Sequence, residues 1–151
     1  MSSSANSEVR IYGVLSNALD EVWHEVVPFL ENAIEYSDGK FSLRDTRENL
    51  EKTLAQLWVG YDSEGLCVTF VTEIIEYPQK RVLLIKFLGG RRFDTWVHRI
   101  DFLREFAYEK GCTAIELYGR PGWEKVLKKF SYQKMYSVLV LDLKGINDGS
   151  R

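Results

Sequence analysis

One stretch decides the fold: RVLLIKFLGGRRFDTWVHRIDFLREFAYEKGCTAIELYG, residues 81–119. It begins with a nearly continuous apolar run, which is typical of a strand covered on both faces. Apolar residues then recur at helical spacing and form one stripe: Trp96, Ile100, Leu103 and Ala107, broadened by Phe102 and Phe106. The helix ends at Lys110-Gly111, and a second strand, TAIELYG, follows. This short strand–helix–strand unit predicts parallel neighbouring strands with a right-handed crossover.

Upstream of that unit, the chain predicts one strand and two helices. The strand covers residues 9–15 (VRIYGVL), and the first helix covers residues 17–36. Pro28 lies inside this helix and predicts either a kink or a division into two short helices. SLRD, residues 42–45, has the spacing of a capping box, which opens a second helix that runs through Leu54.

A hairpin and a final helix–strand pair complete the pattern. Residues 57–74 (LWVGYDSEGLCVTFVTEI) predict two strands that flank a DSEG turn. Residues 121–130 predict a helix with Pro121 in its first turn, and residues 136–143 (YSVLVLDL) predict the last strand. The order is therefore β-α-α-β-β-β-α-β-α-β, an α/β (α+β) protein with a mixed central sheet and helices on both faces.

Length and composition fit one globular domain. The chain has 151 residues, of which 45% are hydrophobic and 28% charged, as in ordinary globular domains. We expect a single domain over residues 9–144. Residues 1–8 and 145–151 are small, polar and unpatterned, so we expect them to be disordered tails.

Charge and hydropathy exclude several classes of partner. The net charge of −2 gives no global attraction to nucleic acid, and the aromatic residues mostly fall on core-facing positions. No apolar stretch is long enough to span a bilayer, and no signal-like region follows Met1. We therefore expect no nucleic-acid partner, no membrane partner and a cytoplasmic location.

The cysteines and histidines give no sign of a metal site. Cys67 and Cys112 lie in apolar surroundings and are expected to be buried thiols, with a disulfide as the alternative. His24 and His98 lack the short spacing of metal ligands, and the cysteines form no CxxC pair. We expect no bound metal.

The element order now resembles that of a known family. Together with the hairpin at residues 57–74 and the strand–loop–helix ending in FAYEKG, it resembles the GNAT-like acyltransferases, in particular small, divergent members that bacteriophages encode. GRPGW (residues 119–123) and KKFSYQ (residues 128–133) look like the last helix and strand of that family. The resemblance covers residues 9–143, nearly the whole chain.

The resemblance implies a function and a cofactor. It implies an N-acyltransferase that uses acetyl-CoA, with pantetheine inserted where the sheet splays between the LLIKFL and AIELYG strands. The acceptor would be an amine on a protein or a small molecule, and the protein would be a monomer or a homodimer. It would act in the cytoplasm, that of the host if a phage encodes it, or belong to the virion.

The loop that would bind the cofactor phosphates departs from the family pattern. That pattern has Arg or Gln, two spacers, a glycine, one spacer, then glycine or alanine. The matching positions are Arg91, Asp94 and Trp96, so the arginine is present and both small residues are absent. Asp94 would repel phosphate, and Trp96 would prevent close approach of a ligand.

Two interpretations of this loop stay open. In the first, Gly89 and Gly90 let the backbone turn, and Arg91 and Arg92 contact phosphates. In the second, the glycines form a simple strand-end turn, Asp94 or Thr95 caps the helix, and the arginines are solvated. The candidate cofactor-binding residues are Phe87, Leu88, Gly89, Gly90, Arg91, Arg92, Thr95 and Arg120. For Arg120, the alternative is a surface charge that packs over Trp123.

Acyl transfer also needs a base for the amine and an acid for the leaving thiolate. Glu73 and Glu76 are candidate bases, and Glu73 shares a strand face with Thr69 and Val71. Glu116 and Tyr118 share a face of the next strand, and Tyr118 could donate a proton to sulfur. Our candidate catalytic residues are Glu73, Glu116 and Tyr118. The structural alternatives are an ion pair of Glu116 with Lys86 and exposed hairpin charges at Glu73 and Glu76.

A non-catalytic function is the alternative. The family often has a tyrosine acid in its last helix, and Leu127 stands at the matching position, so that role is vacant or falls to Tyr118 or Tyr132. Asp94, Trp96 and Leu127 together favour a GNAT-fold protein that has lost cofactor binding. Such a protein would serve as a binding or virion-associated module.

Overall fold

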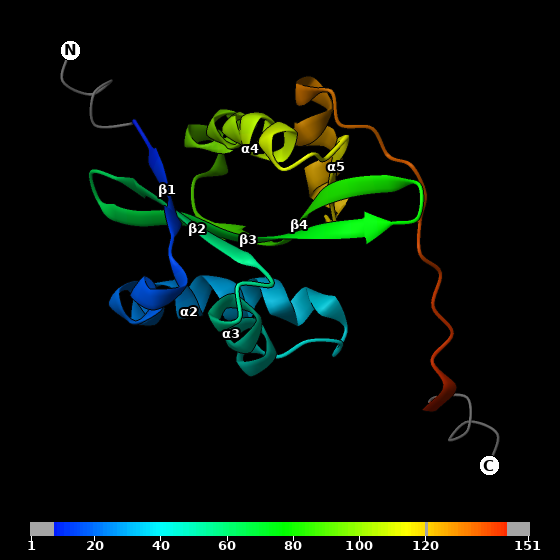
Figure 1. Cartoon of the computed structure of the whole chain (residues 1–151), viewed down its shortest axis with the longest axis horizontal. Helices are drawn as coiled ribbons and strands as arrows, with labels where there is room; N and C mark the ends of the chain where they lie inside the picture. The colour runs from blue at the N-terminus through cyan, green and yellow to red at the C-terminus, as the bar shows by residue number, and fades with distance from the viewer. Residues whose placement is uncertain (1–7, 120, 145–151) are drawn as a thin grey trace. The chain divides into compact units, whose positions relative to one another are not determined.

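The computed structural model describes residues 8–119 and 121–144, and the chain divides into two compact units, Met1–Arg120 and Pro121–Arg151 (Figure 1). The tails expected at residues 1–8 and 145–151 lie outside the described residues, apart from Glu8.

The first unit contains one five-stranded mixed sheet. Its strands are β1 (Arg10–Val14), β2 (Gln56–Asp62), β3 (Gly65–Tyr77), β4 (Lys80–Gly90) and β5 (Ala114–Leu117), and they lie in that order across the sheet. The pairs β1–β2, β2–β3 and β3–β4 are antiparallel, and β5 runs parallel to β4. The hairpin and the parallel pair predicted from the sequence are confirmed.

One face of the sheet is covered by helices α2 (Leu19–Ile34) and α3 (Leu43–Glu51) (Figure 1). The prediction of two short helices at Pro28 is wrong, because α2 is a single helix that contains this proline. A proline inside a helix costs one hydrogen bond. Val26 and Leu30 flank Pro28 and are completely buried, so their packing offsets that loss.

The start of α3 confirms the predicted capping box, whereas its end comes early. The Asp45 N–H donates to Ser42 Oγ at 3.1 Å, and the Ser42 N–H donates to Asp45 Oδ2 at 3.0 Å. The helix ends at Glu51, before Leu54, and Thr53 has a φ of 58°. Leu54 is exposed, so no burial holds it in a further helical turn.

The opposite face of the sheet carries α4 (Leu103–Glu109) (Figure 1). The expected longer helix is replaced at its start by two 3₁₀ segments, η3 (Phe93–Thr95) and η4 (Val97–Phe102). Trp96 separates them with a φ of −127°, which lies outside the helical region. The predicted stripe is nevertheless buried: Trp96, Ile100, Leu103 and Ala107.

The second unit contains α5 (Pro121–Leu127) and η5 (Lys128–Phe130), followed by an extended segment. The last strand predicted over residues 136–143 is not formed, since none of the described residues beyond 131 is in a strand. A strand requires a hydrogen-bonded neighbour as well as suitable side chains. The element order therefore agrees with the prediction up to α5.

The two cysteines are free thiols, so the disulfide alternative is wrong. Both are buried, and burial raises the pKa of the Cys67 and Cys112 thiols above the ordinary value. No helix among residues 8–119 and 121–144 is long and apolar enough to cross a bilayer. The same residues contain no group of three or more side chains that could hold a metal ion.

Candidate functional site

Strands β4 and β5 separate halfway along β4. Their register begins at Val82 opposite Ala114 and ends at Ile85 opposite Leu117. The last backbone contact across the pair is a 3.5 Å hydrogen bond from the Tyr118 N–H to the Ile85 carbonyl. Within the first unit, residues 86–90 continue β4 beside β3, and no other described strand of that unit pairs with them. Within that unit, the backbone groups of β4 that face away from β3 are therefore available for hydrogen bonds.

A β-bulge lies at the point of separation. Val71 of β3 stands opposite Phe87, and the next residue, Thr72, stands opposite Ile85. Lys86 is therefore the extra residue of β4. Bulges bend a strand and change the direction of a side chain, and they are frequent beside active sites.

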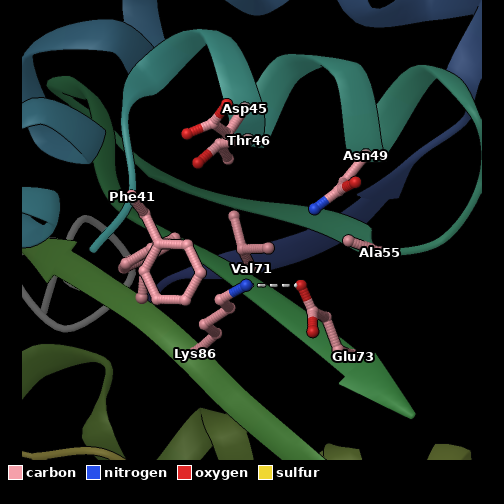
Figure 2. A pocket seen from close by; sticks show the side chains of 9 residues that line it. Phe41, Asp45, Thr46, Asn49, Ala55, Val71, Glu73 and Lys86 are labelled. Carbon is pink, nitrogen blue, oxygen red and sulfur yellow. Dashed lines mark hydrogen bonds and ion pairs between the residues drawn. The ribbon is translucent and has the colours of Figure 1, made fainter. Parts of the chain in front are cut away.

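Lys86 lies in a hollow between α3 and the sheet (Figure 2). Its Nζ is 2.9 Å from Oε2 of Glu73 and 3.8 Å from the centre of the Phe41 ring. The two charged side chains are only 10% and 18% exposed. The hollow is small, with a cavity volume of about 10 Å³, and Asp45 and Asn49 line its helical side (Figure 2).

This ion pair corrects two interpretations made from the sequence. Lys86 pairs with Glu73 and not with Glu116, because β3 remains beside β4 at the bulge whereas β5 has diverged. Glu73 is also not an exposed hairpin charge. Glu76 does fit that description, since it is exposed and lies 3.3 Å from Arg81 near the β3–β4 turn.

The other candidate catalytic residues lie on or after β5. Glu116 is half-buried opposite Leu84 of β4. Tyr118 follows the end of β5 and is exposed. The structure thus joins Glu73 with Lys86. It places Glu116 on β5, which borders the splayed region, and Tyr118 directly after that strand.

The glycines after the bulge belong to β4 and not to a turn. A Cβ atom at Gly89 would lie 2.6 Å from the Phe29 carbonyl oxygen of α2, and one at Gly90 would lie 2.7 Å from the Cys67 carbonyl oxygen. Both interpretations of a glycine turn are therefore wrong. The glycines allow α2 and β3 to approach β4 closely, and the chain turns only at Arg92, with a φ of 49°.

Arg91 and Arg92 are held by the β2–β3 turn. Arg91 Nη2 donates to Asp62 Oδ1 at 3.1 Å, and Arg92 Nη2 donates to Asp62 Oδ2 at 2.9 Å. The side chain of Asp62 is 3% exposed and also accepts the Glu64 N–H at 2.8 Å. Glu64 lies 3.3 Å from Arg92 as well. The interpretation of simply solvated arginines is therefore wrong.

These contacts change the acidity of Asp62. Burial by itself acts to raise the pKa of this carboxyl group. The hydrogen bonds from Glu64 and Arg91, with the positive charges of Arg91 and Arg92, outweigh burial and hold the pKa of Asp62 below its usual value. The carboxylate is thus the resident anion beside the two guanidinium groups.

Asp94 and Thr95 do not cap a helix. No side-chain capping hydrogen bond is present at η3, η4 or α4, and Thr95 Oγ1 instead donates to the Arg92 carbonyl at 2.8 Å. Trp96 is completely buried, and its Nε1 donates to the Arg91 carbonyl at 2.9 Å. The buried indole therefore helps to fix the backbone of the loop at Arg91.

The remaining candidate residues for cofactor binding and proton transfer do not lie together. Phe87 and Leu88 are buried in β4, and the Phe87 ring meets that of Phe41 edge-on at 5.8 Å. Arg120 lies outside the described residues. Leu127 and Tyr132 belong to the second unit, where the Tyr132 N–H donates to the Leu127 carbonyl at 3.3 Å.

Sequence reasoning missed two features of the site. It treated Lys86 only as a partner for Glu116, although one lysine within the apolar run LLIKFL was a signal of a special position. It treated Asp62 and Glu64 only as turn residues, and no local pattern linked that turn to Arg91 and Arg92, which follow 29 and 30 residues after Asp62.

Comparison with known proteins shows the fold. No protein-family model and no curated protein matches the chain. An aminoglycoside acetyltransferase from an uncultured soil metagenomic sample is similar in structure, with a TM-score of 0.65 and 14% identity over 89% of this chain and 96% of that one. A ribosomal-protein-alanine N-acetyltransferase from Brucella melitensis has a TM-score of 0.66 and 15% identity over 89% and 99% of the two chains.

A third solved structure has a cofactor in its crystals. It is described as a predicted acetyltransferase with acetyl-CoA from Clostridium acetobutylicum, with a TM-score of 0.64 and 15% identity over 91% of this chain and 97% of that one. At this level of identity the similarity concerns the fold. The chain therefore has a GNAT-like acetyltransferase fold, as the sequence resemblance implied.

Proposed function

We propose that the protein is an N-acyltransferase that transfers an acetyl group from acetyl-CoA to an amine. The observation that carries this proposal is the separation of β4 from β5 at Ile85, with Lys86 bulged at that point. The open backbone of residues 86–90 offers N–H and C=O groups to the amides of a pantetheine arm, in the manner of an added strand. Acetyl-CoA would supply the activated thioester.

Glu73 is our candidate for binding the acceptor amine. It lies in a hollow beside the bulge, where its carboxylate and the Phe41 ring already hold the ammonium group of Lys86. An acceptor ammonium could take the same two contacts and lose its proton toward Glu73. Glu116 on β5 is the candidate for a second proton-transfer group, and Tyr118, directly after β5, is the candidate for protonation of the thiolate.

Arg91 and Arg92 would meet the cofactor phosphates. A guanidinium group has five N–H donors, and the contacts of Arg92 with Asp62 and Glu64 both use Nη2. Arg92 can therefore add a phosphate contact without leaving Asp62. Thr95 and Arg120 remain candidates for further phosphate contacts.

The acceptor is an amine on a protein or a small molecule. Structural neighbours support both classes: one is a ribosomal-protein-alanine N-acetyltransferase, and another is an aminoglycoside acetyltransferase solved in complex with trehalose and with sisomicin. We place the reaction in the cytoplasm, that of the host cell if a bacteriophage encodes the protein.

One observation favours a non-catalytic module as the second candidate function. Asp62 already occupies the centre of the Arg91–Arg92 pair, and the loop rests on the buried indole of Trp96. A protein that had lost cofactor binding would show this self-contained loop. It would act as a binding or virion-associated module.

Thermal unfolding with acetyl-CoA, S-acetylpantetheine and ADP separates the two functions. Binding at about a hundred times the dissociation constant stabilises a protein by about 2.7 kcal/mol. We expect stabilisation by acetyl-CoA and, at higher concentration, by S-acetylpantetheine, because the splayed strand binds the pantetheine arm. ADP, which has no pantetheine arm, is the matched control for binding of the nucleotide part of the cofactor alone. No stabilisation by either thioester at millimolar concentration would refute the transferase and leave the binding module.

A further inference from the structure

Helix α3 forms one wall of the hollow that holds Lys86 and Glu73. Asp45, Thr46 and Asn49 of this helix line the hollow on the side opposite the ion pair (Figure 2). The cavity volume is about 10 Å³, which is room for about one water molecule. An amine that carries even a short carbon chain is larger than this. An acceptor therefore reaches Glu73 only after the hollow has widened.

The walls of the hollow differ in how firmly they are held. Glu73 and Lys86 lie in the paired strands β3 and β4. Among the described residues, the backbone hydrogen bonds of α3 are all formed within residues 42–54. Only Leu43 and Leu50 are apolar in its sequence LRDTRENLE, fewer than an amphipathic helix usually buries. Few buried apolar contacts mark a region of low local stability, so α3 is the wall that can move.

Residues with left-handed backbone angles flank α3 at both ends. Asp38 and Gly39 precede the helix with φ values of 60° and 77°, and Thr53 follows it with a φ of 58°. This conformation is unusual for a β-branched residue such as threonine. When an element moves as a rigid body, a few residues at its ends absorb the change in backbone angles. These three residues are therefore suitable hinges for α3.

Arg47 ties α3 to α2. Its Nη2 donates to Oδ1 of Asp20 in α2 at 2.7 Å, and its Nε donates to Oε2 of Glu51 in α3 at 2.8 Å. The guanidinium carbon also lies 4.8 Å from the centre of the Trp23 ring of α2. The side chain of Asp20 is 92% exposed. An exposed ion pair and a cation–π contact are each weak by themselves, so this tie can open and close reversibly.

We propose that α3 is a lid over the Lys86–Glu73 pair, that its hinges are the left-handed residues at its two ends, and that Arg47 is its latch to α2. With the lid closed, the hollow is too small for an acceptor. When the guanidinium group leaves its two partners on α2, the helix moves away from the sheet and uncovers the ion pair. As a lid over an acceptor site, α3 rests on the proposed function. Its opening needs no cofactor and is measured without one.

Chemical acetylation of Lys86 measures the opening of the lid. The side chain is 10% exposed, so N-hydroxysuccinimidyl acetate should reach its Nζ mainly when α3 has moved. Mass spectrometry of the peptide that contains Lys86 gives the rate. Arg47→Ala should raise this rate about tenfold, because the ion pair and the cation–π contact with α2 are both lost. The matched control is Arg44→Ala on the same helix, which removes an 88% exposed side chain that contacts Glu48 of α3 and should leave the rate unchanged.

Alkylation of Cys67 separates lid opening from unfolding of the whole sheet. This thiol is completely buried in β3, so iodoacetamide reaches it only when the sheet itself opens. We expect Arg47→Ala to leave the rate of Cys67 alkylation unchanged. An unchanged acetylation rate of Lys86 in Arg47→Ala, an equal increase in Arg44→Ala, or an equal increase at Cys67 would each overturn the lid. Stabilisation by acetyl-CoA is measured separately, so the transferase can fail while the lid stands, and the reverse.

Discussion

The cations of two ion-pair groups lie on β4 and in the loop that follows it, and the two groups differ in their surroundings. At the bulge, Lys86 makes one 2.9 Å contact with Glu73 and borders a hollow that reaches solvent. In the loop, Arg91 and Arg92 share one carboxylate, Asp62, which is almost fully buried and receives a backbone hydrogen bond as well. To open the first pair, a competing ammonium group would have to replace Lys86 at both the Glu73 carboxylate and the Phe41 ring.

The comparison shows that charge in a suggestive loop is a poor guide to a binding site. The two glycines followed by two arginines suggested a phosphate-binding loop. In the structure the glycines allow close packing, and the arginines bind Asp62 of the β2–β3 turn. The bulge was not predicted from the sequence, yet it places Lys86 beside a small hollow. Binding requires groups that a ligand can reach, and only the three-dimensional structure shows which groups those are.

The largest expected effect tests the packing role of the glycines between the two pairs. Gly89→Ala places a methyl group 2.6 Å from the Phe29 carbonyl oxygen, and overpacking of this kind costs about 3 kcal/mol of unfolding free energy. Urea denaturation measures the change. Gly122→Ala is the control, because a Cβ atom there meets nothing within 4 Å. Equal stability of the two variants would show that Gly89 is not needed for close approach.

The second effect tests the pair at the bulge. Glu73→Gln removes the counter-charge of a mostly buried ammonium group and should cost about 2 kcal/mol, less than a fully buried pair because both side chains are partly solvated. The double variant Glu73→Gln with Lys86→Met should recover most of that loss, since no unpaired charge remains. Chemical denaturation of the single and double variants gives the coupling energy.

A control for the bulge pair is available on the same strand. Glu76→Gln removes the exposed contact with Arg81 and should change stability by at most about 0.5 kcal/mol. If the double variant is no more stable than Glu73→Gln, then the cost does not arise from an uncompensated Lys86.

The smallest effect tests the loop pair through pH. The pKa of Asp62 is lower in the folded protein, so its stabilising contribution is fully present above the unfolded pKa of about 3.9 and is lost as the pH falls through the folded pKa. Asp62→Asn should therefore cost about 1 kcal/mol at pH 7, with Arg91 and Arg92 half in solvent. Below pH 3 the difference should shrink. Stability curves of the two proteins that stay parallel down to pH 2 would contradict this account.

Individual elements show how far the sequence predicts the fold. The capping box at Ser42 and Asp45, the hairpin around the DSEG turn and the parallel β4–β5 pair all follow from local spacing, and all are observed. The division into two short helices at Pro28 and a regular helical start of the α4 region were mispredicted. In both places buried side chains, Val26 and Leu30 in one and Trp96 in the other, prevail over local backbone preference.

The candidate site was predicted in part. The separation of β4 from β5 and the choice of Glu73 as a candidate base were predicted from the sequence and its resemblance to a family. The partner of Glu73 did not, because Lys86 reaches it only through a bulge that depends on the pairing of β3 with β4. The link between Asp62 and the two arginines depends in the same way on a contact between segments about thirty residues apart.

By itself, the sequence determined which segments are helical or extended and which of their faces are apolar, since periodicity and capping are local properties. Only the tertiary structure decided which segments have neighbours. It gave β4 a partner on one side beyond Ile85, gave the arginines a resident anion and left the strand-like residues 136–143 without a sheet. The physical reason is that hydrogen-bonded pairing and charge compensation join residues far apart in the chain, and no local pattern records them.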